Sequence, residues 1–145
     1  MFSAVDIKVD ADGDIELDEP KDIKLATPQE TLSQEILFRI KTDHLDYAPD
    51  PYIGANLTQF VEEENTRRKS EQIIEQVSIS LSRNPIFPPE QLFVDAVPLS
   101  ANTMAIFAVF TGAVDGTKDS TIVTHTIDRT IGRVDNESII NTTVL

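Results

Sequence analysis

Closely spaced carboxylates near residue 10 are the first feature of the chain that could bind a ligand. The stretch "DADGDIELDE", residues 10–19, places six acidic side chains around Gly13. A helix–loop–helix calcium site needs Gly at loop position six and a bidentate Glu at position twelve, where this stretch has Ile15 and Lys21. The spacing therefore argues against that calcium loop and favours a solvated chain reversal that can touch a basic neighbour.

No other residue pattern indicates a reaction centre, so we expect no catalytic residue, cofactor or metal. His44 and His125 are far apart in the chain and neither has ligand-like spacing around it. The chain has no Cys, which removes thiolate ligands and thiol nucleophiles. Its 25 acidic residues contain many possible carboxylate pairs, such as Glu30 with Glu35, and none is singled out as a glycosidase pair.

A short basic run, Arg67, Arg68 and Lys69, is a local exception in an acidic protein. It falls in the first turn of an expected helix, where the helix dipole disfavours cations. These side chains can pair within the molecule, with Glu62–Glu64 or Glu71, or they can contact an acidic neighbour. Both interpretations remain open at the level of sequence.

Length and charge limit the class of protein. The chain has 145 residues, which suits one domain, and a formal charge of −13. Such a surface repels phosphate backbones and anionic lipid, so we expect neither nucleic-acid nor membrane partners. The chain shows no secretory signal and no apolar run of about 18 residues, so we expect a soluble protein made in the cytoplasm.

The N-terminal residues alternate between apolar and polar types, which is typical of a strand or hairpin. A three-residue loop, Ala11-Asp12-Gly13, would pair Val9 with Ile15 and Ile7 with Leu17, with Gly13 in the left-handed conformation. An extended arm without a hairpin is the alternative. We identify no internal repeat in the sequence.

Two long helices are predicted in the middle of the chain. In "TPQE", residues 27–30, Thr can cap a helix, Pro suits its first position and Glu completes a capping box, which predicts a helix over 28–42. Asn65 is expected to cap a second helix over 66–83, whose apolar residues follow a 3.6-residue period. A short helix is expected within 55–63.

The remainder is predicted to form strands. "LFVDAVPL" and "MAIFAVF" are apolar runs joined by the turn "SAN", and "TIVTHTIDRTIGRV" follows a second turn. The last ten residues, "NESIINTTVL", can be a final strand or a projecting arm, and we expect "SIINTTVL" to lie outside the sheet. The predicted fold class is therefore α+β: two main helices on a small mixed sheet. The predicted parts are an acidic N-terminal hairpin or arm (1–26), the α+β domain (27–134) and a C-terminal β arm (135–145).

This order of parts resembles the baseplate wedge and sheath-initiator family of contractile phage tails, small proteins often labelled lysozyme-like. In that family the first helix ends in an R-L-x-T type segment, matched by Arg39-Ile40-Lys41-Thr42. The following loop carries Gly-x-x-Leu, matched by Gly54-Ala55-Asn56-Leu57. A Glu-Pro-Arg triplet then ends the second helix, whereas Arg83-Asn84-Pro85-Ile86 keeps only its proline.

The resemblance implies a structural role without catalysis: a virion protein of the tail baseplate that starts the tail sheath. Strands are donated between neighbouring subunits in such sheaths, and the resemblance implies that this chain offers the first donor or acceptor. The implied partners are the tail sheath protein and other baseplate wedge and hub proteins, with multiple copies around the tail axis. The segment from Thr121 to Leu145 suits strand donation, because it is rich in β-formers and has no Pro.

These considerations give a set of residues expected to contact partners. The acidic N-terminal segment and the C-terminal arm are expected to carry most contacts, with the basic run as a secondary patch. The individual candidates are Arg67, Arg68, Lys69, Asn84, Pro85, Ile127, Ile131, Ile139, Ile140, Val144 and Leu145.

Two other classes of function compete with this interpretation. One is a peptidoglycan hydrolase of the tail, following the lysozyme-like label, in which one Glu or Asp would be essential. The other is an acidic adaptor that binds a host regulator, which would be a folded monomer without projecting ends.

Overall fold

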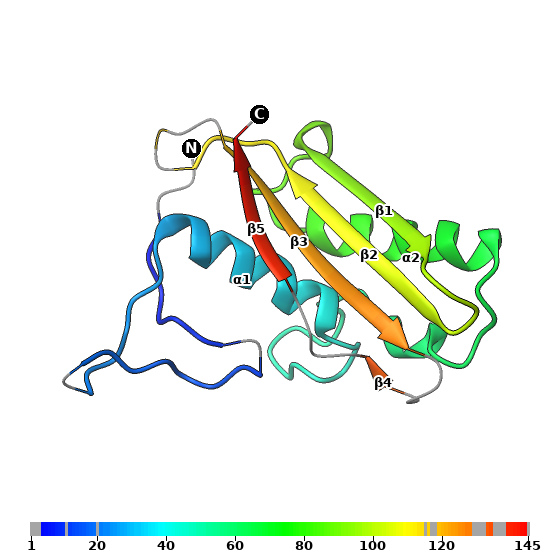
Figure 1. The fold of residues 1–145 in the computed structure, drawn as a ribbon, viewed down its shortest axis with the longest axis horizontal. Coiled ribbons are helices and arrows are strands. Elements are labelled where there is room, and N and C mark those ends of the chain that lie inside the picture. Colours follow the sequence, from blue (N-terminus) through cyan, green and yellow to red (C-terminus); the bar gives the residue numbers. More distant parts are fainter. Residues whose placement is uncertain are drawn as a thin grey trace.

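A computed structural model describes residues 4–10, 12–19, 21–114, 116, 119–128, 133–134 and 139–144. The fold is α+β, with two helices lying against an antiparallel sheet (Figure 1). The elements of the described part are α1 (Pro28–Lys41), the 3-10 helix η1 (Leu57–Phe60), α2 (Arg67–Ser82), the 3-10 helix η2 (Pro89–Gln91), β1 (Leu92–Pro98), β2 (Thr103–Phe110), β3 (Asp119–Asp128), β4 (Arg133–Val134) and β5 (Ile139–Val144).

The sheet has the order β1-β2-β3, and both β4 and β5 pair with the outer side of β3. The strand pairings in the described residues are antiparallel, so the expected mixed sheet is wrong in this respect. The physical reason is the length of the connections: short turns reverse the chain, whereas parallel neighbours need a long crossover.

Residues 139–144, near the end of the chain, are part of the sheet. Strand β5 pairs with β3 from Asp119↔Val144 to Thr124↔Ile139, although we expected this stretch to lie outside the sheet. Pairing satisfies the backbone hydrogen bonds along one side of β3, which water would otherwise have to satisfy. The boundary residues 135–138 and 145 of the expected arm lie outside the described residues.

Both helices cover the same face of the sheet, α2 along β1 and α1 along β3 (Figure 1). Helix α1 begins with the predicted capping box, in which Thr27 accepts from the Glu30 N–H while Glu30 accepts from the Thr27 N–H. Helix α2 is capped by Thr66 instead of the expected Asn65. The layer between helices and sheet is the core, and it includes Leu32, Ile36, Ile40, Ile73, Val77, Leu81, Val94, Ile106, Val123 and Ile127.

The loop after α1 is fixed by a close backbone approach at Gly54. This residue has φ +97°, and a Cβ atom there would overlap the carbonyl group of Thr42. The neighbouring N–H groups of Ala55 and Asn56 donate to the carbonyls of Arg39 and Thr42, and Leu57 is buried. Glycine followed three residues later by leucine thus ties this loop to the end of α1.

The described residues before α1 form a segment of turns and isolated β-bridges beside this helix. Val9 pairs with Ile15 as predicted, and Gly13 has the expected positive φ. Ile7, however, pairs with Leu25, and Leu17 pairs with Ile23. The segment is therefore not a simple hairpin, because a third stretch closes it.

The three stretches are copies of one tetrapeptide at eight-residue spacing, a repeat that the sequence analysis missed. They are Asp6-Ile7-Lys8-Val9, Asp14-Ile15-Glu16-Leu17 and Asp22-Ile23-Lys24-Leu25. We call residues 6–26 the triple-repeat segment. Its hydrogen bonds close a ring: the N–H of Lys8 donates to Lys24 O, that of Lys24 to Glu16 O, and that of Glu16 to Lys8 O. Because each copy bonds to both others, the segment holds its shape with little core of its own.

Candidate functional site

The outer side of β3 is the first candidate contact site, because strand exchange needs an edge whose present occupant can leave. Over the described residues, β5 has β3 as its hydrogen-bonded neighbour, and β4 extends the pairing only at Ile127 and Asp128. Nothing in the described part pairs with the other side of β5. This edge is therefore open to addition of a strand, or to replacement of β5.

The opposite edge of the sheet is guarded against pairing. On β1, the backbone N–H of Ala96 is occupied by the side chain of Asp95 at 2.8 Å, and Pro98 has no N–H to offer. Charged side chains and proline are common devices for protecting an edge strand. The two edges thus differ, and the edge at β5 is the better candidate for strand exchange.

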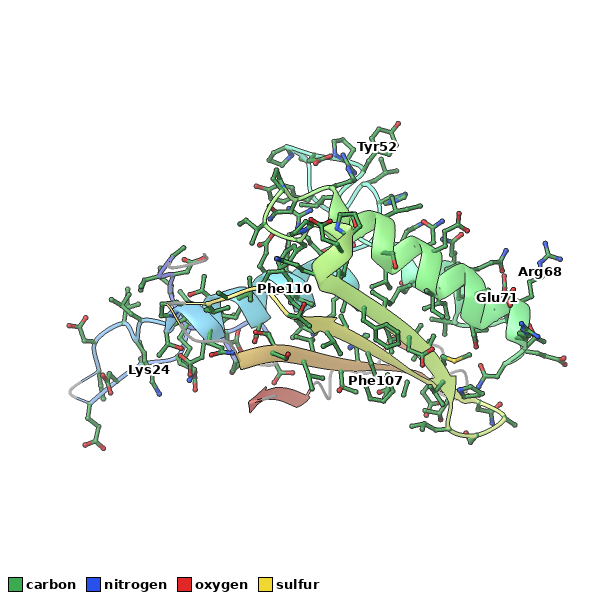
Figure 2. The ribbon with its side chains drawn as sticks, turned by 90° about the horizontal axis from the view of Figure 1, so that it is seen from above. Lys24, Tyr52, Arg68, Glu71, Phe107 and Phe110 are labelled. Carbon is green, nitrogen blue, oxygen red and sulfur yellow. The ribbon has the colours of Figure 1, made fainter. Side chains whose placement is uncertain are left out.

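The sheet face away from the helices is partly apolar. Phe93 and Val97 on β1 are exposed, and Phe107 on β2 and Ile122 on β3 are half-buried on the same face. Figure 2 shows Phe107 and Phe110 at separate positions on β2; Phe110 belongs to the buried face and packs against Phe87. An exposed apolar sheet face next to an open edge suits contact with another protein.

The basic run does not act as one patch. Arg67 and Arg68 are exposed at the start of α2, and Arg67 Nε lies 2.9 Å from Glu71 Oε1. Figure 2 shows Arg68 and Glu71 at this end of the helix. Lys69 is only 2% exposed, and its Nζ donates to Glu63 O and Asn65 Oδ1. Asn65 in turn donates from Nδ2 to Ser100 O and Thr103 O, so the bond between Lys69 and Asn65 links α2 to the β1–β2 turn. Lys69 is thus a buried structural residue and not a contact residue.

Asn84 and Pro85 lie in the turn after α2, close to α1. The side chain of Asn84 accepts from the Ile86 N–H and donates to Glu35 Oε1, which also pairs with Arg39. Pro85 is exposed. Asn84 therefore has an internal structural role in joining the two helices, whereas Pro85 remains available at the surface.

The strand candidates have different positions. Ile127 is 1% exposed and belongs to the core, so a contact with a partner at this residue would require the sheet to open; this prediction is corrected. Ile139, Ile140 and Val144 lie on β5, where the backbone is placed along β3. Ile131 and Leu145 lie outside the described residues.

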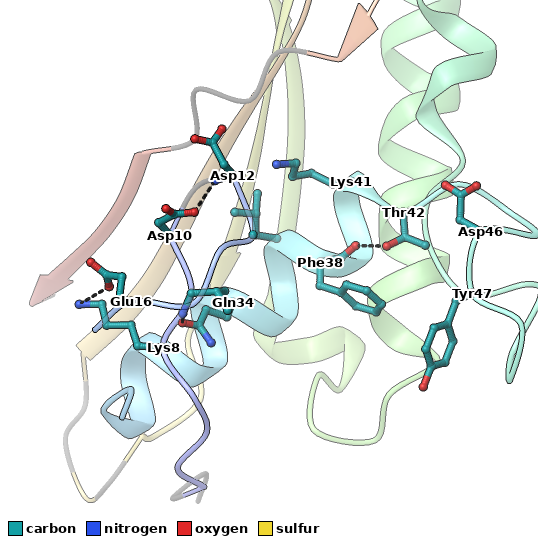
Figure 3. A pocket seen from close by; sticks show the side chains of 13 residues that line it. Lys8, Asp10, Asp12, Glu16, Gln34, Phe38, Lys41, Thr42, Asp46 and Tyr47 are labelled. Atoms are coloured by element: carbon teal, nitrogen blue, oxygen red, sulfur yellow. Dashed lines mark hydrogen bonds and ion pairs between the residues drawn. The ribbon is translucent and has the colours of Figure 1, made fainter. Parts of the chain in front are cut away.

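A groove between the triple-repeat segment and α1 is a candidate binding cavity. Its volume is about 620 Å³, and Figure 3 shows it from close by. Val9, Leu37 and Phe38 supply apolar surface, and Phe38 meets Tyr47 edge-to-face. The acidic residues along its lining are Asp10, Asp12, Glu16 and Asp46, against the bases Lys8 and Lys41.

The acidic turn at this groove is held by its own hydrogen bonds. Asp10 Oδ1 accepts from the N–H groups of Asp12 and Asp14, which is the local turn chemistry of an Asp side chain. The described residues contain no group of three His, Cys, Asp or Glu side chains placed to hold a metal ion. His125 is buried within β3, which is far from this turn in the sequence.

An ion pair fastens the triple-repeat segment to α1. Lys8 Nζ lies 2.7 Å from Glu30 Oε1 and 3.5 Å from Glu16 Oε2. The hydrogen bond from Lys8, with the Thr27 N–H, lowers the pKa of the Glu30 carboxyl below its ordinary value. The same bond to Glu30 raises the pKa of the Lys8 ammonium.

Gln34 on α1 makes the second fastening, which sequence reasoning did not identify. Its Nε2 donates to Ile7 O at 3.2 Å and its Oε1 accepts from Val9 N at 3.0 Å. The side-chain amide thus pairs with the strand edge as a neighbouring strand would. The signal that could have pointed to this contact is the repeated D-I-[KE]-[VL] pattern together with a polar residue on the otherwise apolar side of α1.

Comparisons with profiles of protein families, with curated proteins and with solved structures found no match to this chain. None of the helices in the described ranges has the length and apolar character needed to cross a membrane. The class defined by fold and site is an α+β domain with an open sheet edge and an acidic groove.

Proposed function

We propose that this chain is a structural subunit of a contractile-tail baseplate wedge, and that it initiates assembly of the tail sheath by exchanging a strand at the outer side of β3. The observation that carries the proposal is the position of β5: it covers β3 as an edge strand, with β3 as its hydrogen-bonded neighbour among the described strands. The resemblance of the helix and loop motifs to the wedge family supports the same role.

The guarded state of the other edge supports this choice of site. Asp95 and Pro98 protect β1, so strand addition there would have to displace a side chain and would lack one backbone donor. At β3, replacement of β5 by a strand of a sheath subunit conserves the number of backbone hydrogen bonds. The backbone bonding therefore contributes little to the net free energy of the exchange, which is decided by the side-chain contacts that the incoming strand makes.

The acidic groove supports contacts with a second neighbour in the baseplate. Its apolar wall and its excess of carboxylates favour a segment that carries both apolar and basic side chains. In this role the triple-repeat segment binds a wedge protein while the β3 edge meets the sheath. The two sites lie on different parts of the molecule (Figure 1).

A reversible crosslink between β3 and β5 tests the exchange. Ile122 and Asn141 are directly opposite each other in the register, and the chain has no native Cys. We expect the double variant Ile122→Cys, Asn141→Cys to close a disulfide, since opposed residues of antiparallel strands are within about 5.5 Å at Cα. The variant is expressed together with the sheath and baseplate genes of the contractile tail to which the proposal assigns it, and sheath assembly is scored by electron microscopy.

The expected result is that the oxidised double variant fails to start sheaths and that reduction restores them. Each single Cys variant is the matched control and should behave as the unmodified chain. Sheaths that form equally well on the oxidised variant would contradict strand exchange at β3. Sheaths that assemble normally when this chain is omitted would contradict the wider role in the baseplate.

A further inference from the structure

The first copy of the repeat shows how this segment binds a helix. Its strand edge, Ile7 O and Val9 N, is bonded to the amide of Gln34, and its Lys8 is bonded to Glu30 one turn earlier on α1. A helix with Glu four residues before Gln therefore meets all three polar groups of one copy.

The third copy repeats this chemistry. Its sequence, Asp22-Ile23-Lys24-Leu25, differs from the first only by Leu in place of Val. The Ile23 N–H donates to its own Asp22 Oδ1 at 2.8 Å, as the Ile7 N–H does to Asp6 Oδ1 at 2.7 Å. The backbone bonds of the two copies also correspond. The Lys24 N–H donates to the carbonyl of Glu16 in the second copy, as the Lys8 N–H donates to the carbonyl of Lys24 in the third.

The third copy has no helix of its own chain. Among the described residues, Ile23 O, Leu25 N and Lys24 Nζ have no bonding partner, and Ile23 and Leu25 are 50% and 63% exposed. Figure 2 shows Lys24 on the part of the segment that lies away from α2. The second copy is not equivalent, because it has Glu16 where the others have Lys, and Glu16 already pairs with Lys8.

We propose that the third copy binds a helix of a partner protein in the way that the first copy binds α1. The partner helix carries Glu four residues before Gln, so that its carboxylate meets Lys24 and its amide meets Ile23 O and Leu25 N. Apolar residues beside that pair cover Ile23 and Leu25. This surface is separate from the β3 edge, and the inference does not depend on the proposed role in sheath assembly.

The probe is a synthetic helix that copies only the relevant face of α1. It spans residues 27–42, with Leu32, Ile36 and Ile40 changed to Ala so that it cannot replace α1 in the core. A hydrocarbon staple fixes the helix, which circular dichroism verifies, because a free peptide of this length is marginally helical. It is titrated into the ¹⁵N-labelled full chain to about 1 mM, a range that detects weak binding.

We expect chemical-shift changes at the amides of Ile23, Lys24 and Leu25. A probe with Gln34→Leu should bind at least about tenfold more weakly, because it leaves two backbone groups without partners. In the full chain, Lys24→Met should weaken binding by a similar factor, since it removes a charge-assisted bond. Leu25→Ala should also weaken binding, because it removes apolar surface that the partner helix would cover. Leu17→Ala, in the second copy, is its matched control and should leave binding unchanged.

Two results would overturn the inference. One is the absence of shifts at the third copy throughout the titration while the Val9 amide shows that the segment is still docked on α1. The other is equal binding of the original probe and the Gln34→Leu probe. A shift pattern at the acidic groove in place of the third copy counts as the first of these two results.

Discussion

The ammonium group of Lys8 lies 2.7 Å from a carboxylate oxygen of Glu30, and this pair joins the triple-repeat segment to the first turn of α1. Glu30 is at the same time the capping-box residue at N3, the third position of the helix. One carboxylate therefore starts the helix and fastens the segment that precedes it.

This pair predicts how stability responds to acid. The pKa of Glu30 is lowered in the folded protein, so its ionised form stabilises the fold above its unfolded pKa of about 4.3, and that contribution is lost as the pH falls through the folded pKa. Glu30→Gln keeps a capping side chain but removes the charge. We expect the variant to be less stable by up to about 1 kcal/mol at pH 7, since the pair is partly exposed.

Urea unfolding of both proteins at neutral pH and at about pH 3 measures the effect, because only the unmodified chain titrates at this position. The difference in unfolding free energy should shrink in acid. Glu71→Gln, which breaks the exposed pair with Arg67, is the control and should cost less. A difference that stays constant with pH would show that Lys8 and Glu30 are not coupled in the folded state.

Gln34 should decide whether the triple-repeat segment stays docked. Gln34→Met removes both bonds to the strand edge while keeping the length of the side chain. We expect faster proteolysis within residues 4–26 and little change in the thermal midpoint of the remaining domain, because the core does not depend on the segment. Gln76→Met on α2 is the matched control; equal cleavage of the two variants would argue against this role for Gln34.

Gly54 should tolerate no side chain. Gly54→Ala must place a Cβ atom against the Thr42 carbonyl at a positive φ, so we expect a loss of at least about 3 kcal/mol from strain and overlap together. Gly13→Ala is the matched control, because Gly13 also has positive φ but open space around it, and should cost about 1 kcal/mol. Chemical denaturation measures both; similar losses would mean that φ alone explains the glycine at position 54.

Lys69 should behave as a core residue despite its charge. Lys69→Met leaves Glu63 O and Asn65 Oδ1 without their donor, and we expect it to cost about 2–4 kcal/mol. Arg68→Met, one residue earlier and exposed, should change stability by no more than about 0.5 kcal/mol. Thermal and urea unfolding distinguish the two, and equal effects would place Lys69 at the surface.

The sequence by itself determined the local elements. Residues 27–30 specify the start of α1 through side-chain caps, and apolar runs on either side of "SAN" specify the β1–β2 hairpin. Such signals are readable because the interacting groups lie within a few residues of each other. The spacing around Asp10 likewise predicted a turn, which the structure confirms at Val9 and Ile15.

Only the tertiary structure decided the long-range pairings. It placed β5 on β3, closed the triple-repeat segment through Ile7 and Leu25, and buried Lys69 and Ile127. Each depends on which distant group bonds to a backbone or charged side-chain group. Asn65 Oδ1 accepts from the Lys69 side chain instead of capping the backbone of α2, and the Gln34 amide bonds to the strand edge as a neighbouring strand would. Composition and periodicity carry no information about such partners. A polar side chain can make its hydrogen bonds equally well with water at the surface or with a distant part of the chain.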